Sequence, residues 1–390
     1  MTKDKTSPFT IEGIHYETGN PVRIEIIDGR IGSIVEIAGL KDENNKLFVA
    51  PGLIDNQLNG YVNVDFSGSE LVAEDIIYAT KAIWKDGVTS FLATLVTNSH
   101  ERLIRDFKIL DEALRKDEQI RESIPGFHLE GPYISPDEGY RGGHPVQHIR
   151  KISWDEFTEY QKAAGGRIIE VTIAPELEGA MEFIKLCRQN GIVVAMGHTN
   201  ATAEQISSAV ENGVRLSTHL GNGCANFIHR HNNPIWPQLA NDRLTPSIIA
   251  DGHHLRPEEV AVFYKVKGPD NLILTSDVVY LVGMPPGKYF FAGNDVILKE
   301  DGMLLIEKLN CLAGASFPLK KGVENVMNFT GCSLAKAINM ASRNVARIYN
   351  LNDRGTLAQG KRADLILFER DGNQLQIKKT YLNGIIVYQE

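Results

Sequence analysis

The middle of the chain alternates short apolar runs with amphipathic segments. The apolar runs are 47–54, 88–96, 124–129, 168–174, 192–196, 214–216, 247–250 and 272–274. The amphipathic segments between them include 70–85, 102–116, 153–164, 179–190, 203–212 and 257–266. Short apolar runs predict buried strands, and the segments with helical spacing predict helices. Strictly alternating strands and helices indicate parallel strands joined by right-handed crossovers.

About eight such units over roughly 300 residues favour one closed (β/α)8 barrel of the TIM type. The alternative is an open, doubly wound sheet. It is weakened because no Gly-x-Gly-x-x-Gly motif follows the first strand.

Both ends of the chain have a different pattern, typical of short strands and tight turns. Residues 24–27 and 31–37 are apolar and flank Asp28-Gly29, a hairpin dipeptide. Near the other end, the runs 363–368, 375–381 and 385–388 are separated by turn residues, including Asn383-Gly384. We therefore expect one small β domain built from residues 1–50 and 358–390, around a barrel domain at 51–357.

Composition mainly excludes functions. The net charge is −8, from 41 basic and 49 acidic residues, which argues against a nucleic-acid partner. The four cysteines are far apart, so neither a disulfide framework nor a zinc finger is expected. The sequence contains no long apolar segment and no leader after Met1, so we expect no membrane association and a cytoplasmic location.

Polar side chains follow the predicted strands at the points where each strand ends. The motifs are Asp55-Asn56-Gln57-Leu58-Asn59, His128-Leu129-Glu130, Gly197-His198, Thr218-His219, Asp251-Gly252-His253-His254 and Ser276-Asp277. In a barrel, the carboxyl ends of all strands meet at one mouth, where active sites lie. We therefore expect these side chains to converge.

The set Glu130, His198, His219 and Asp277 predicts a metal-dependent hydrolase. Two histidines and one glutamate suit a catalytic metal with a position open for water. Asp277 would accept the proton of that water and return it to a leaving group. Taken singly, each residue has a structural explanation: a loop histidine, a salt bridge for Glu130, or a helix N-cap for Asp277. Their joint placement favours the catalytic interpretation.

The first strand argues against a second metal. Barrel hydrolases with two metals commonly carry His-x-His there, whereas this chain has Gln57 and Asn59. Amides are poor ligands for zinc-like ions. We therefore expect one divalent metal per subunit, with zinc favoured and iron(II), cobalt(II) or nickel(II) as alternatives. The alternative view of Gln57 and Asn59 is that they are polar turn residues.

Taken together, these motifs resemble the N-acetylglucosamine-6-phosphate deacetylases of the amidohydrolase superfamily. The likeness covers nearly the whole chain and includes Pro51-Gly52-Leu53-Ile54-Asp55, His128-Leu129-Glu130-Gly131-Pro132, Gly197-His198-Thr199, Ser217-Thr218-His219-Leu220, Ile249-Ala250-Asp251-Gly252-His253-His254 and Cys311-Leu312-Ala313-Gly314. The ending from Gly355 to Leu365 is general to amidohydrolases.

The resemblance implies a barrel with a small β-sandwich domain, a homodimer, and deacetylation of N-acetylglucosamine-6-phosphate. It implies that Glu130, His198 and His219 hold the metal and that Asp277 is the proton shuttle. The substrate contacts it implies are Gly143, His144, Asn222, Gly223, Arg230, His254, Leu312, Ala313 and Gly314. Among these, Asn222, Arg230 and His254 would serve the sugar phosphate, which is chemically reasonable because arginine binds phosphate through charge-assisted hydrogen bonds.

The sequence departs from the family around the sugar rather than among the metal ligands. His219 is followed by Leu220-Gly221-Asn222-Gly223-Cys224, where the family usually has an aromatic residue and Asn-Ala-Met, and the loop to Pro237 is unusual. Two alternatives therefore remain open: an amidohydrolase acting on a different N-acetylhexosamine or another amide, and a metal-free sugar-phosphate binding protein.

Overall fold

The computed structural model describes residues 7–40 and 46–390. Residues 1–5, on which the expectation about a leader rested, lie outside the described part. Within that part, no helix is long and apolar enough to cross a membrane.

Eight parallel strands form the barrel, in the spatial order in which they follow one another along the chain. They are β5 (Leu53–Leu58), β8 (Val88–Val96), β9 (Gly126–Glu130), β10 (Ile168–Ile173), β11 (Val193–Met196), β12 (Leu216–Ser217), β13 (Thr245–Ile248) and β14 (Ile273–Leu274). Every residue of β5, β8 and β9 is buried, as expected for parallel strands covered on both faces. The predicted barrel is confirmed.

The barrel closes through the segment after β14 rather than through a ladder between β14 and β5. Asp277 N donates to Gln57 O at 3.1 Å, and Asn59 N donates to Val278 O at 2.8 Å. These bonds hold the loop that carries Asp277 against the end of β5.

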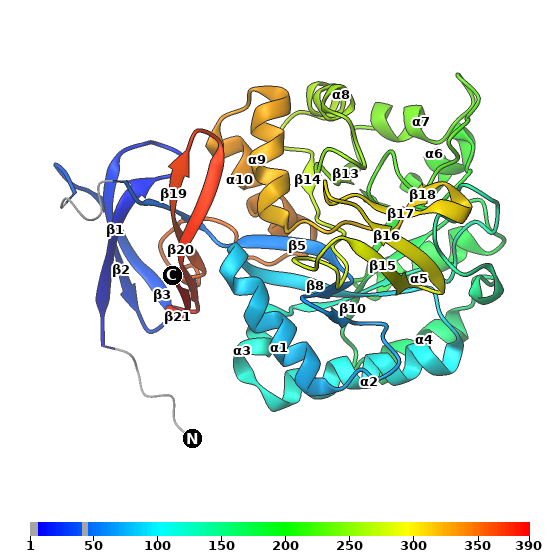
Figure 1. Cartoon of the computed structure of the whole chain (residues 1–390), viewed down its shortest axis with the longest axis horizontal. Coiled ribbons are helices and arrows are strands. Elements are labelled where there is room, and N and C mark those ends of the chain that lie inside the picture. The colour runs from blue at the N-terminus through cyan, green and yellow to red at the C-terminus, as the bar shows by residue number, and fades with distance from the viewer. Residues whose placement is uncertain (1–6, 41–45) are drawn as a thin grey trace.

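Helices surround the barrel, as Figure 1 shows. They are α1 (Ala73–Ile83), α2 (His100–Lys116), α3 (Glu118–Ser123), α4 (Trp154–Ala163), α5 (Ala180–Gln189), α6 (Ala203–Asn212), α7 (Ile235–Ala240), α8 (Pro257–Lys267), α9 (Leu319–Thr330), α10 (Leu334–Met340) and α11 (Arg343–Ile348). Short 3-10 turns are η1 (Trp84–Asp86), η2 (Val146–His148) and η3 (Glu307–Leu309). Helix starts follow capping rules: Ser99 Oγ accepts from Arg102 N at 3.2 Å at the start of α2.

Strands from both ends of the chain share one seven-stranded sheet beside the barrel, seen in Figure 1 as blue and red strands on one side of the molecule. In spatial order they are β21 (Ile385–Gln389), β20 (Gln374–Leu382), β19 (Leu365–Asp371), β4 (Phe48–Pro51), β1 (Phe9–His15), β2 (Pro21–Ile27) and β3 (Arg30–Glu36). At the β3 edge of this sheet, Ile31 N donates to Lys361 O at 2.9 Å, so this edge contacts the segment that leads into β19. The domain boundaries given above stay a prediction.

Two details of the strand predictions changed. The apolar run 47–54 is divided between two sheets: β4 pairs with β1 and β19, whereas β5 opens the barrel. A four-stranded antiparallel sheet near the barrel mouth was not predicted. Its strands are β15 (Gly287–Phe291), β16 (Asn294–Leu298), β17 (Leu304–Ile306) and β18 (Cys311–Leu312), and a small pair, β6 (Gly60–Tyr61) and β7 (Val64–Asp65), follows β5. Figure 1 shows the four strands in yellow.

Candidate metal and substrate site

Glu130, His198 and His219 converge at the carboxyl ends of three barrel strands. Glu130 ends β9, and each histidine lies two residues beyond its strand, β11 or β12. Glu130 Oε1 lies 2.9 Å from His219 Nε2 and 3.3 Å from His198 Nε2, and the two Nε2 atoms are 3.2 Å apart. Three atoms that can ligate a metal, one from each side chain, therefore lie within 3.3 Å of one another.

The backbone is strained where these side chains leave their strands. His198, His219 and Asp277 have positive φ angles of 50°, 30° and 50°. Residues other than glycine rarely adopt this region, and such strain of about 1–3 kcal/mol typically persists at functional sites.

The hydrogen bonds of His198 fix which nitrogen is free. His198 Nδ1 lies 3.0 Å from Tyr140 O, and a carbonyl oxygen only accepts, so Nδ1 carries the proton and Nε2 keeps its lone pair. A ligating histidine needs this arrangement. Glycines make room for the ring: an added Cβ would lie 3.2 Å from His198 Cε1 at Gly142 and 2.9 Å from His198 Nδ1 at Gly223.

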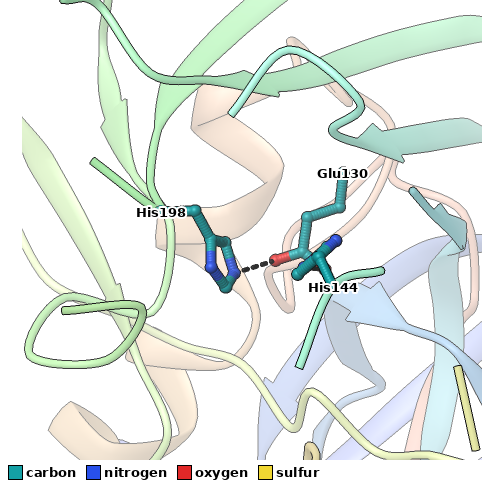
Figure 2. Close-up of side chains that lie close together, drawn as sticks. All are labelled: Glu130, His144 and His198. Carbon is teal, nitrogen blue, oxygen red and sulfur yellow. Dashed lines mark ion pairs between the residues drawn. The ribbon is translucent and has the colours of Figure 1, made fainter. Parts of the chain in front are cut away.

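A third histidine stands next to this cluster. Figure 2 shows His144 and His198 close to Glu130, and one ligand atom from each of these three residues lies within 4.8 Å of the others. His144 Nε2 is 3.8 Å from Glu130 Oε2, while His144 Nδ1 lies 2.8 Å from Thr97 Oγ1. Burial lowers the pKa of His144 to about 3, so its ring is neutral. The side chain can thus act as a donor, an acceptor or a ligand.

Asp277 lies beside the cluster and is held by two amides. Gln57 Nε2 donates to Asp277 Oδ1 and to Glu130 Oε1, both at 2.9 Å, and Asn59 Nδ2 donates to Asp277 Oδ1 at 2.7 Å. Both bonds reach the same oxygen, so Oδ2 remains for other chemistry. Burial, and then the charge of Glu130, raise the pKa of Asp277 to about 6, which suits a general base.

The donor set fits a metal ion. Burial raises the pKa of Glu130, but its interactions with His198 and His219 outweigh burial and bring the pKa well below the usual value, so the carboxylate is charged. One carboxylate and two imidazole nitrogens, nearly in mutual contact, match the ligands of a divalent transition metal.

A cavity of about 640 Å³ opens above these residues. Of the predicted site residues, it is lined by Glu130, Gly143, His144, His198, His219, Asn222, Gly223, His254, Asp277, Leu312, Ala313 and Gly314. Arg230 is exposed and is absent from the lining, although its carbonyl oxygen accepts a bond from Trp236 Nε1 at 3.0 Å. The structure therefore brings together every predicted residue except Arg230.

Three contributions to the site were not predicted. Gln57 and Asn59 were left open as turn residues, yet they hold the acidic side chains. The four-stranded sheet supplies Phe291, Ala292 and Ile306 to the cavity wall. It also fixes the loop before His144, because Asn294 Nδ2 donates to Gly143 O at 2.8 Å. A series of short apolar runs separated by turn residues between 287 and 312 was the available sequence signal.

Comparison with known proteins identifies the family of this chain. The model of the amidohydrolase family matches residues 48–387. The chain belongs to the amidohydrolase family. Its relatives include the N-acetylglucosamine-6-phosphate deacetylases of Bacillus subtilis (strain 168), 32% identical over 82% of this chain and 80% of that protein, and of Bos taurus, 33% identical over 87% and 83%.

Solved structures of this family agree with the fold. The N-acetylglucosamine-6-phosphate deacetylase of Thermotoga maritima has a TM-score of 0.86 and 29% identity, covering 98% of this chain and all of that chain. A mutant of the Mycobacterium smegmatis enzyme, solved in complex with N-acetyl-D-glucosamine-6-phosphate, has a TM-score of 0.87, 27% identity and the same coverage. The family resemblance inferred from the motifs is confirmed.

Proposed function

We propose that this chain hydrolyses the acetamide of N-acetylglucosamine-6-phosphate, releasing acetate and glucosamine-6-phosphate. The observation that supports this most directly is the convergence of Glu130, His198, His219 and Asp277 at one end of a cavity large enough for a sugar phosphate. The identity to deacetylases over more than four-fifths of the chain supports the substrate.

One divalent metal ion, zinc in our proposal, would be held by Glu130, His198 and His219. His219 is preferred to His144 as the third ligand because its Nε2 is 2.9 Å from Glu130, against 3.8 Å for His144. A bound metal ion of this kind supplies a Lewis acid that acidifies water and polarises a carbonyl oxygen. Iron(II), cobalt(II) and nickel(II) suit the same ligands.

The protein residues divide the remaining work. Asp277 Oδ2 accepts the proton of the attacking water, since Oδ1 is already held by Gln57 and Asn59. Asp277 then returns that proton to the amine nitrogen as the C–N bond breaks. His144, anchored through Thr97, orients the acetamide. The neutral ring of His144 can donate to an oxygen that gains negative charge.

The rest of the sugar would contact the other predicted residues of the cavity wall, namely Gly143, Asn222, Gly223, His254, Leu312, Ala313 and Gly314. We retain Arg230 as a proposed phosphate contact that would require its exposed loop to reach the ligand. A cytoplasmic homodimer is the proposed assembly, and light scattering in solution tests the dimer.

The decisive test is acetate release from N-acetylglucosamine-6-phosphate by protein loaded with zinc, iron, cobalt or nickel. We expect turnover that a chelator abolishes and added metal restores. The proposal is refuted if none of the N-acetylhexosamine phosphates releases acetate with any of these metals. A protein that binds the sugar phosphate without metal would instead support the metal-free alternative.

A second substrate, N-acetylgalactosamine-6-phosphate, is favoured by one observation. The chain is 28% identical to the N-acetylgalactosamine-6-phosphate deacetylase of Escherichia coli O157:H7 over 93% of both proteins. Comparing kcat/KM for the two epimers, with and without the 6-phosphate, decides between them and tests the remaining alternative, an amidohydrolase that needs no phosphate.

A further inference from the structure

A carboxylate outside the cavity holds the turn that follows His198. Glu176 lies in the loop between β10 and α5, three residues beyond the end of β10. Its Oε1 accepts from Asn200 N at 2.7 Å, and its Oε2 accepts from the Thr199 hydroxyl. Both oxygens of one carboxylate therefore bind the two residues that come directly after His198. The described residues that line the cavity include His198 but none of these three.

The turn is buried and internally bonded. Thr199 is only 3% exposed, and its Oγ1 accepts from Ala201 N at 3.0 Å while its hydroxyl proton goes to Glu176. The side chain of Thr199 thus links the carboxylate to the backbone two residues further on. This small network spans the whole segment from His198 to the residue before the cap of α6.

His198 needs support at this turn because its backbone is strained. Its φ of 50° lies in the left-handed region, which residues other than glycine keep only where surrounding contacts hold them. Two such contacts come from the loop after β9: Ser135 N donates to His198 O at 2.9 Å, and His198 Nδ1 donates to Tyr140 O at 3.0 Å. They hold the carbonyl and the ring of His198. Glu176, from the loop after β10, holds the residues that follow.

A carboxylate is suited to this position by its chemistry. The N–H of Asn200 and the O–H of Thr199 both donate, so their common partner must accept at two separate atoms. A carboxylate has two accepting oxygens, whereas a side-chain amide has one oxygen and an NH2 group that only donates. Glutamine at position 176 would therefore keep part of the contact, and alanine would keep none.

We propose that Glu176 is a positioning residue for the metal site, which acts through the turn at 199–200 to hold His198 Nε2 beside Glu130 and His219. This inference rests on the proposed function, because it takes His198 as a metal ligand. The position that Glu176 maintains is the one in Figure 2, where His198 Nε2 lies 3.3 Å from Glu130 Oε1. Without Glu176 the strained turn relaxes, and His198 spends less time in the geometry that a metal ion requires.

The test is zinc affinity, measured on metal-free enzyme by competition with a chelator. Residues that support a ligand from behind typically change metal affinity 10- to 100-fold, so we expect Glu176→Ala to bind zinc about 10- to 100-fold more weakly than wild type. Glu176→Gln should fall between the two. In cobalt(II)-loaded enzyme, the visible absorption bands report ligand geometry and should shift in Glu176→Ala. With zinc in excess, KM should remain at the wild-type value, because Glu176 does not line the cavity.

Thr202→Ala is the matched control for a loss of stability alone. Thr202 caps α6 in the same loop, and its Oγ1 accepts from Gln205 N at 3.3 Å. Removing a cap destabilises the fold, so Tm should fall while the zinc affinity and the cobalt spectrum stay at wild type. Equal losses of zinc affinity in Thr202→Ala and Glu176→Ala would overturn the proposal, because loop stability would then explain both.

A double-mutant cycle tests the route through the turn. Thr199→Val removes the hydroxyl that Glu176 binds, so combining it with Glu176→Gln should weaken zinc binding by less than the two single effects together. Fully additive losses, or wild-type zinc affinity in Glu176→Ala, would overturn the proposal. If the wild type binds zinc but releases no acetate, the proposed reaction fails and the zinc affinities still decide the role of Glu176. A wild type that binds no divalent metal refutes both.

Discussion

Replacing Asn59 by leucine should separate catalysis from metal binding. Asn59 Nδ2 donates to Asp277 Oδ1 at 2.7 Å, and its side chain makes no hydrogen bond to Glu130, His198 or His219 within the described residues. Leucine has nearly the same shape but no donor. The substitution also removes Asn59 Oδ1, a buried oxygen without a partner, so the folded state should lose little stability.

The expected size follows from one bond to a charged group. Such a bond contributes about 1.5–3 kcal/mol, and about 1.4 kcal/mol corresponds to a tenfold change in rate. We therefore expect kcat to fall about ten- to a hundredfold. The bond from Asn59 also lowers the pKa of Asp277 against the effect of burial. Without that bond the pKa of Asp277 rises further, so the base stays protonated to higher pH. The acidic limb of the kcat/KM profile therefore shifts to higher pH.

The assay is acetate release across pH, together with metal content by elemental analysis and Tm by calorimetry. Gln57→Leu is the matched comparison, because Gln57 donates to both Asp277 and Glu130. It should lower kcat and also weaken metal retention. A kcat of Asn59→Leu within about twofold of wild type, or metal loss as ready as in Gln57→Leu, would contradict the role of Asn59 on Asp277.

Three further results are expected. Asp277→Asn should keep its metal but lose about 10²- to 10⁴-fold in kcat, and near-wild-type turnover with metal content unchanged would remove the base assignment. Gly223→Ala places a Cβ 2.9 Å from His198 Nδ1 at a φ of 57° and should weaken metal affinity, measured by chelator competition. Gly166→Ala, at a φ of 78° with no atom within 4 Å, is its control and should only lower Tm; equal metal loss in both would show that backbone strain alone is responsible. Burial lowers the pKa of His128 from 6.5 to about 4, so the unfolded state gains a proton first and stability declines as pH falls from 6.5 towards 4. His128→Gln should flatten that part of the Tm profile in metal-free protein, and an unchanged slope would contradict the linkage.

The barrel was predictable because its strands are buried on both faces and therefore form uninterrupted apolar runs. The pattern could not show that one apolar run contributes strands to two sheets. Residues 47–54 form a single apolar run, yet Gly52 separates β4 from β5. The antiparallel sheet at 287–312 escaped prediction because its strands are short and half exposed.

The site was predictable as far as strand ends determine it. Glu130 ends a barrel strand, and His198, His219 and Asp277 each follow one, so the topology alone brings them together. The roles of Gln57 and Asn59 depend on partners more than 70 residues distant in the chain, which residue type and spacing do not reveal. Arg230 was taken from family resemblance, and it lies on an exposed loop whose sequence departs from the family's pattern.

The sheet made from both ends of the chain bears on how the protein is synthesised. β4 pairs with β19, and about 300 residues separate them, which a ribosome takes about 15–60 s to add at typical rates. During that time the N-terminal strands emerge with an open, hydrogen-bonding edge, the feature through which strands of different chains associate. The barrel meanwhile can fold behind them. Solubility during expression should therefore depend on the first fifty residues more than their distance from the catalytic centre suggests. A circular permutant, in which the two ends are linked and new ends are made elsewhere, would shorten the time for which this strand edge is exposed.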